Sequence, residues 1–157
     1  MDEELQYAAH RHFSTHCFNA AWDLIDKPER TPNEDEAMIN LCHASLWHWS
    51  QRVDCTSRHR SIGYWQASRV YALLRHADRA RHYAELSLQS SGAEDPFLTG
   101  YAYEALARAE AVCGDQHKMR DYVQMAIENA NRVSDADDRN RLLDDIKSIG
   151  LMAPESV

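Results

Sequence analysis

Apolar residues recur at steps of three and four along most of the chain, which is the spacing of one face of an α-helix. The first such run predicts a helix over about residues 2–26, with this apolar stripe: Leu5, Ala9, Phe13, Cys17, Ala20 and Leu24. Alanine and leucine together number 34, whereas valine, isoleucine and threonine number 16, so composition also favours helix over strand. We therefore predict an all-α protein.

Capping residues, prolines and glycines place the remaining helix boundaries. Asn33 is a good N-cap, Asp78 another, and Asp95 followed by Pro96 is a strong start signal. Gly92 and Gly114 are typical of helix ends. The predicted helices after the first cover about residues 33–53, 61–75, 78–92 and 96–113, with a sixth beyond Gly114 and a seventh from residue 134 or 135 to Gly150.

The third and fourth predicted helices form a pair that returns as the fifth and sixth. A shift of 39 residues superimposes Arg69 on Arg108, Ala72 on Ala111, Arg81 on Arg120 and Tyr83 on Tyr122. The chain therefore contains an internal repeat of a helical hairpin.

This repeat resembles the tetratricopeptide repeat family, which places small residues and aromatics at fixed points of a hairpin. The first copy matches at Tyr71, Ala80, Tyr83, Ala84 and Ser87, the second at Met119, Tyr122, Val123 and Ala126, and a fainter copy at Ala37, Leu41 and Ala44. Met119, Glu110 in place of Tyr71, and the spacing of 39 rather than about 34 depart from the family pattern. The phrases HASLWHW, YWQASRVY and YEALARA also resemble a group of small uncharacterised bacterial repeat proteins.

The resemblance implies three antiparallel hairpins stacked as a short superhelix, with the seventh helix as a C-terminal cap. We expect one domain over residues 1–150 and a short tail over 151–157.

In such proteins the first helices of the hairpins line a concave surface that binds a peptide or protein segment. The exposed residues expected there are Trp22, Ile62, Trp65, Arg69, Tyr101, Glu104 and Arg108. Aromatic area beside arginines suits a peptide or a small anionic ligand, so the leading hypothesis is a non-catalytic binding or scaffold module. In the alternative interpretation Arg69 and Glu104 pair across neighbouring helices and the tryptophans fill interfaces.

The formal net charge of −8 argues against a general nucleic-acid binder, which needs a basic face. Between Gln51 and His82, however, seven arginines stand against two aspartates, a local balance of +5 that leaves −13 elsewhere. This asymmetry suits an anionic partner or a structural homo-oligomer in which basic and acidic parts of two copies meet. Solvated helix faces without a partner are the alternative.

The predicted second helix is apolar or aromatic on almost every side, which predicts burial all round. His43 and His48 on it are then hydrogen-bonded members of the core. A second hypothesis places them in an enclosed pocket with Glu104, as in a small-ligand enzyme or a metal-dependent protein.

Chemistry-bearing motifs are otherwise sparse. His12 and His16 share a helical face at a chelating spacing, yet two ligands do not make a metal site. The chain has no Gly-rich phosphate loop, G-x-S-x-G or H-E-x-x-H motif, so we expect no cofactor and favour a protein without catalytic activity. The four cysteines are scattered, the N-terminus is acidic, and no apolar run spans a bilayer, which together predict a cytoplasmic protein without a membrane partner.

Overall fold

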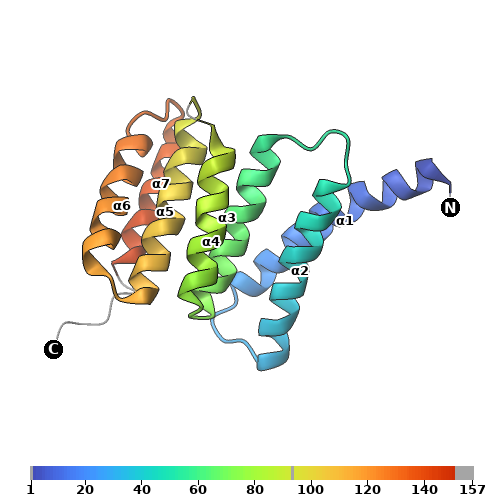
Figure 1. The fold of residues 1–157 in the computed structure, drawn as a ribbon, viewed down its shortest axis with the longest axis horizontal. Coiled ribbons are helices and arrows are strands. Elements are labelled where there is room, and N and C mark those ends of the chain that lie inside the picture. The colour runs from blue at the N-terminus through green and yellow to red at the C-terminus, as the bar shows by residue number, and fades with distance from the viewer. Residues whose placement is uncertain (1, 93, 151–157) are drawn as a thin grey trace.

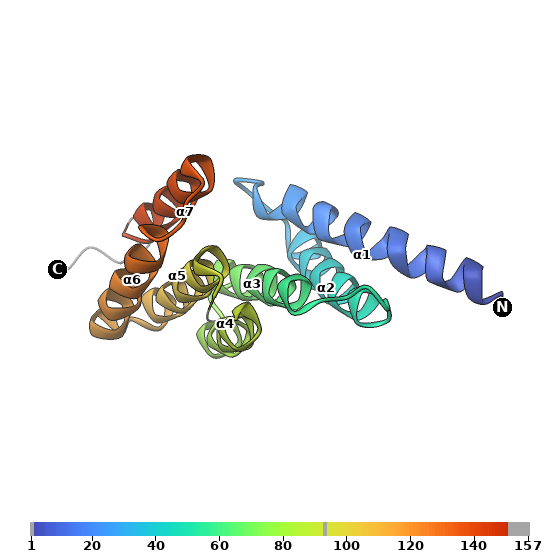
Figure 2. The same cartoon turned by 90° about the horizontal axis from the view of Figure 1, so that it is seen from above.

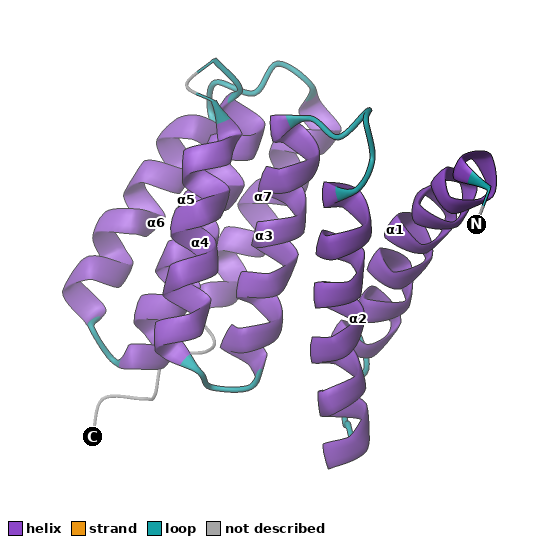
Figure 3. Ribbon diagram, turned by 45° about the vertical axis from the view of Figure 1, so that its right-hand side comes forward, coloured by secondary structure: helices purple, strands orange, loops and turns teal. Residues whose placement is uncertain are grey.

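In the computed structural model, residues 2–92 and 94–150 are described, and their regular secondary structure is entirely helical (Figures 1 and 3). The all-α prediction is confirmed. The predicted tail over 151–157 lies outside the described residues. The helices are α1 (Glu3–Ile25), α2 (Pro32–Ser50), α3 (Ser57–Leu73), α4 (Ala77–Ser91), α5 (Pro96–Cys113), α6 (Gln116–Ala130) and α7 (Ala136–Ile149).

Two helices start earlier than predicted because each has a capping box. Thr31 caps α2 and exchanges hydrogen bonds with Glu34, so this helix begins at Pro32. Thr56 caps α3, and His59 takes the place that a glutamate usually has, because its Nδ1 accepts from the backbone N–H of Thr56. The segment predicted as a loop before residue 61 is therefore the first turn of α3.

The turn between α3 and α4 also differs from the prediction. His76, not Asp78, is the N-cap of α4, and its side chain makes no capping hydrogen bond. Asp78 lies inside the first turn, where its charge suits the positive end of the helix dipole. Arg75, between the two helices, has a positive φ of 64°, so an arginine occupies a left-handed position that favours glycine.

Each helix contacts the helices that precede and follow it in the sequence. The most extensive contacts join α1 to α2, α3 to α4 and α5 to α6, and α4 also packs closely on α5. The last helix, α7, lies against α5 and α6. These contacts are consistent with stacked helical hairpins.

Small residues lie where the helices approach each other most closely. Ala80 and Ala84 of α4 and Ala126 of α6 are fully buried, and Ser87 bonds through its hydroxyl to the backbone oxygen of Ser61 on α3 over 2.9 Å. A larger side chain at these points would hold the paired helices apart.

Seen from above, the molecule has two different sides (Figure 2). Helices α1 and α7 lie at opposite ends of the molecule, on the same side of the layer formed by α3 and α5, and α4 lies on the other side of that layer. Contacts between α1 and α3 are few, whereas those between α3 and α5 are extensive. The first pair of helices thus diverges from the rest, and the side between α1 and α7 is concave.

The prediction that the second helix is buried on every side is wrong. Only Met38, Cys42 and Ser45 of α2 are buried, and Trp47 is 56% exposed. The reason is its position, because α2 packs only on α1 and α3 and has no helix over its outer side. None of the described helices is both long and apolar enough to cross a bilayer.

Candidate functional site

A row of aromatic rings crosses the concave side from α1 to α5. The ring of Trp22 lies 5.3 Å from that of Trp65, and Trp65 lies 4.8 Å from Tyr101. Phe18 extends the row on α1, at 6.4 Å from Trp22, and Phe97 extends it on α5, at 5.0 Å from Tyr101. Four of these five rings are partly exposed, and Tyr101 is 8% exposed. We call these residues, Phe18, Trp22, Trp65, Phe97 and Tyr101, the aromatic row.

Beneath the row, one buried carboxylate gathers three donors. Glu104 is fully buried, and its Oε2 accepts the indole N–H of Trp65 over 3.0 Å. Its Oε1 accepts from Arg69 Nη1 over 3.3 Å and from Arg108 Nε. Burial, followed by the charge of Arg108, lowers the pKa of Arg69, while the Glu104 carboxylate opposes that shift. The cluster ties α3 to α5 by charged hydrogen bonds.

Helix α7 closes this cluster. Arg108 donates from Nη2 to the backbone oxygen of Asp145 over 2.9 Å and to the hydroxyl of Ser148 over 2.6 Å. The hydroxyl of Tyr101 donates to Asp145 Oδ2 over 2.9 Å. Burial, then the charge of Asp145, raises the pKa of Tyr101, so its proton stays in this bond.

The structure corrects the expected exposure of three site residues. Tyr101, Glu104 and Arg108 are buried, because α7 packs on the face of α5 that was expected to be exposed. Arg69 and Glu104 pair across neighbouring helices, as the alternative interpretation predicted. Trp22, Trp65 and Ile62 are partly exposed, and the side chain of Arg69 is 19% exposed, so these residues remain accessible from the concave side.

A cavity of about 160 Å³ opens beside the aromatic row, between α3, α5 and α7. Most of its lining is apolar, and Arg141 of α7 stands at it with a side chain that is 67% exposed. The lining residues are Ser61, Ile62, Trp65, Ser87, Phe97, Leu98, Tyr101 and Arg141. An apolar recess with a charged group beside it is a common form of ligand site.

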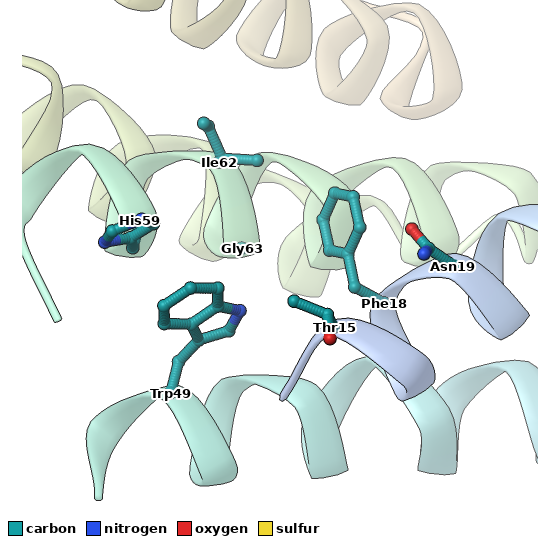
Figure 4. Close-up of a pocket in the computed structure, with 7 residues that line it drawn as sticks. All are labelled: Thr15, Phe18, Asn19, Trp49, His59, Ile62 and Gly63. Carbon is teal, nitrogen blue, oxygen red and sulfur yellow. The ribbon is translucent and has the colours of Figure 1, made fainter. Parts of the chain in front are cut away.

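A second cavity, of about 220 Å³, lies between α1, α2 and α3 (Figure 4). Its lining residues are Thr15, Phe18, Asn19, Trp49, His59, Ile62 and Gly63. Ile62 lines both cavities, so the two lie next to each other along α3. Gly63 has a packing role as well, since an added Cβ would come within 2.6 Å of Leu46 Cδ2 on α2.

The histidines considered for an enclosed pocket have separate partners. His43 Nε2 bonds to the hydroxyl of Tyr71 over 2.9 Å, and burial, then the charge of Arg79, lowers its pKa. His48 Nδ1 lies 3.0 Å from His10 Nδ1, and burial, then His10, lowers the pKa of His48. Neither histidine is among the partners of Glu104 described above, so the structure does not bring the three together.

His12 and His16 stack on each other with ring centroids 5.4 Å apart, and both are exposed. Over the described residues, His, Cys, Asp and Glu side chains form no group of three or more that could hold a metal ion.

Sequence reasoning missed Phe18, Phe97, Arg141 and the contact between Trp49 and His59. Phe18 stands four residues before Trp22, which places both on one helical face, so a signal was present. The stack of Trp49 on His59 joins the end of α2 to the start of α3, with ring centroids 4.1 Å apart. No spacing pattern in the sequence predicts this contact. Arg141 reaches the cavity only through the position of α7.

Searches with protein-family models, against curated proteins and against solved structures found no significant match to this chain.

Proposed function

We propose that this chain is a non-catalytic binding module that holds a peptide segment on its concave side. We also propose that its three helical pairs stack as a short tetratricopeptide-like superhelix, with α7 as the cap. In that arrangement α1, α3, α5 and α7 are the helices that line the inner surface.

The observation that carries this proposal is the continuity of the aromatic row across three helices. Its rings touch one another and are held by packing, so little side-chain entropy is lost when a ligand covers them. Aromatic side chains supply much of the binding energy at protein interfaces. The exposed parts of Trp22, Trp65 and Phe97 therefore offer a preorganised apolar strip to an extended peptide.

Charge near the strip favours an acidic segment. Arg141 stands beside the smaller cavity with a side chain 67% exposed, and Arg58 at the start of α3 is 55% exposed. Both are already near a carboxylate, since Arg58 bonds Asp95 over 2.8 Å and Arg141 lies 3.7 Å from Asp138. Exposed pairs of this kind contribute little, so a peptide carboxylate can compete for either arginine.

The partners of the buried acid support a module without catalysis. Both oxygens of Glu104 accept hydrogen bonds, from Trp65, Arg69 and Arg108, and His43 is bonded to the hydroxyl of Tyr71. Neither Glu104 nor His43 lines either of the two cavities described above, where a substrate proton could be transferred.

Selection of a random displayed peptide library on the immobilised protein tests the proposal. We expect enrichment of peptides that combine apolar and acidic residues. Ile62→Asp should weaken the affinity for the best peptide by about tenfold or more, because it places a charge between the two cavities. Arg141→Glu, at an exposed position, should also weaken the affinity for acidic peptides.

The matched control is Met125→Asp, at an exposed position of α6 on another side of the molecule. It should leave both the affinity and the thermal midpoint unchanged. Absence of any enriched peptide, or equal affinity of the Ile62 and Arg141 variants and the wild type, would reject the proposal.

A further inference from the structure

The larger cavity, between α1, α2 and α3, has a rigid indole at its wall. The guanidinium of Arg52 lies 3.8 Å above the ring of Trp49, and the imidazole of His59 stacks on it at 4.1 Å with an angle of 15°. Two groups this close to the ring cannot share one face, so both faces of the indole are covered. The edge of Trp49 that carries the N–H is not part of either contact.

That edge carries a donor that faces the cavity. In Figure 4 the nitrogen-bearing side of Trp49 is turned toward Thr15 and Phe18. Within the described residues the indole N–H of Trp49 is accessible and has no hydrogen-bond partner, and the exposed side-chain amide of Asn19 on α1 has none either. The hydroxyl of Thr15 donates a hydrogen bond to the backbone oxygen of His12 over 3.1 Å, and its methyl group faces the cavity.

His59 adds a donor of fixed identity. Its Nδ1 accepts from the backbone N–H of Thr56 over 3.1 Å, so the neutral ring carries its proton on Nε2. Burial, followed by the charge of Arg52, lowers the pKa of His59 and keeps the ring neutral near pH 7. Trp49 and His59 therefore each bring one N–H donor to the lining, and Asn19 brings both a donor and an acceptor, so the lining can bind a ligand that carries acceptors.

The size and the lining suit an aromatic group. An apolar cavity of about 150 Å³ is enough to hold benzene, and this one measures about 220 Å³. Phe18 and the edge of Trp49 can meet a third ring in the edge-to-face geometry that aromatic pairs prefer.

We propose that this cavity receives one aromatic side chain of an acidic peptide, whose backbone carbonyl accepts the indole N–H of Trp49. The inference rests on the proposed function, because Ile62 joins this cavity to the aromatic row. Charge complementarity supports an acidic neighbour of the aromatic residue, since Arg58 and Arg60 are both exposed on the first turn of α3 beside His59.

The test uses N-acetyl-L-phenylalanine amide as probe and N-acetyl-L-alanine amide as its control. The indole ¹H–¹⁵N signal of Trp49, assigned through Trp49→Phe, is followed during titration together with the amide of Gly63. The phenylalanine derivative should shift both signals to saturation, and the alanine derivative should leave them in place.

Thr15→Phe supplies the structural control, because a ring at this exposed position of α1 fills the cavity without disturbing the core. It should abolish the shifts, whereas Gln6→Phe, exposed on the same helix and outside the lining, should preserve them. Thermal midpoints equal to that of the wild type establish that both variants fold.

The failures of the two proposals are distinguishable. If displayed peptides bind but tolerate Thr15→Phe, and the probe shifts neither Trp49 nor Gly63, the cavity proposal is overturned while the concave binding surface stands. If no peptide is enriched but the phenylalanine derivative shifts Trp49 in a Thr15-dependent way, the cavity binds aromatic groups and the peptide function fails. Equal shifts with the alanine derivative also overturn the cavity proposal.

Discussion

The indole N–H of Trp65 donates to Oε2 of Glu104 over 3.0 Å and so joins α3 to α5. The same carboxylate accepts from Arg69 and Arg108. Trp65 is therefore both a member of the aromatic row and a support for the helix interface. Its substitution would change stability and binding together, which is why Ile62 and Arg141 are better test positions for the proposed function.

Glu104→Gln should destabilise the protein. The amide keeps an acceptor for Trp65 but removes the negative charge from between two arginines, and breaking a buried pair from one side costs about 3–5 kcal/mol. Chemical denaturation measures the loss. Glu85→Gln, at an exposed position of α4, is the control and should change the free energy of unfolding by less than about 0.5 kcal/mol. Equal stabilities of the two variants would contradict a structural role for Glu104.

Gly100→Ala and Gly63→Ala should have different effects on the stability of the protein. At Gly100 a Cβ would lie 2.6 Å from Leu142 Cδ2 and 3.4 Å from Asn129 Cβ, and Leu142 is fully buried. Overpacking of this kind costs about 1–3 kcal/mol. At Gly63 the clash is with the end of the partly exposed Leu46, which can rotate. Alanine gains about 0.8–1 kcal/mol of helix propensity at both positions, so the difference between the variants comes from packing. Thermal denaturation should rank Gly100→Ala clearly below Gly63→Ala, and the reverse order would contradict the packing described.

Stability should fall as the pH drops below the ordinary histidine pKa of 6.5. Because the folded-state pKa values of His43, His48 and His59 are lowered, the folded protein binds fewer protons than the unfolded chain just below that value. Acid thus favours unfolding. A proton on the accepting nitrogen of the contact between His48 and His10 would in addition set two N–H donors against each other over 3.0 Å.

Urea unfolding at about pH 7.5 and about pH 5.5 measures this effect. Trp47 contacts His10, and Phe13 contacts His48. His12 contacts Phe13 and His16 on α1. His48→Gln should reduce the pH dependence, because it removes one of the three contributing histidines, whereas His82→Gln, exposed on α4, should leave it as in the wild type. A free energy of unfolding that does not change over this range would contradict the lowered pKa values of His43, His48 and His59.

Arg75→Gly should stabilise the protein. Arg75 holds a left-handed φ of 64°, is exposed, and follows the C-cap of α3, so glycine relieves backbone strain there. The expected gain is about 0.5–1 kcal/mol after the greater freedom of the unfolded chain is subtracted. Arg60→Gly, within α3, should instead lose about 1 kcal/mol. A loss in both variants would contradict the assigned turn geometry.

The sequence predicted the helices well because apolar spacing and caps are local signals. The missed start of α3 was also a local error, since the capping box between Thr56 and His59 uses a histidine in place of the usual glutamate. The site was predicted less well, because burial depends on tertiary position. The family resemblance placed Trp65 and Glu104 on one exposed concave surface, but only the position of α7 decides that Glu104 and Tyr101 are covered.

The central claim is that the side between α1 and α7 receives a peptide, and a backbone amide shift map tests it most directly. A peptide selected on the wild-type protein is titrated into ¹⁵N-labelled protein. We predict shifts concentrated around Phe18, Ile62, Phe97 and Arg141. Shifts confined to α2, α4 and α6, or no shifts at all, would contradict the account.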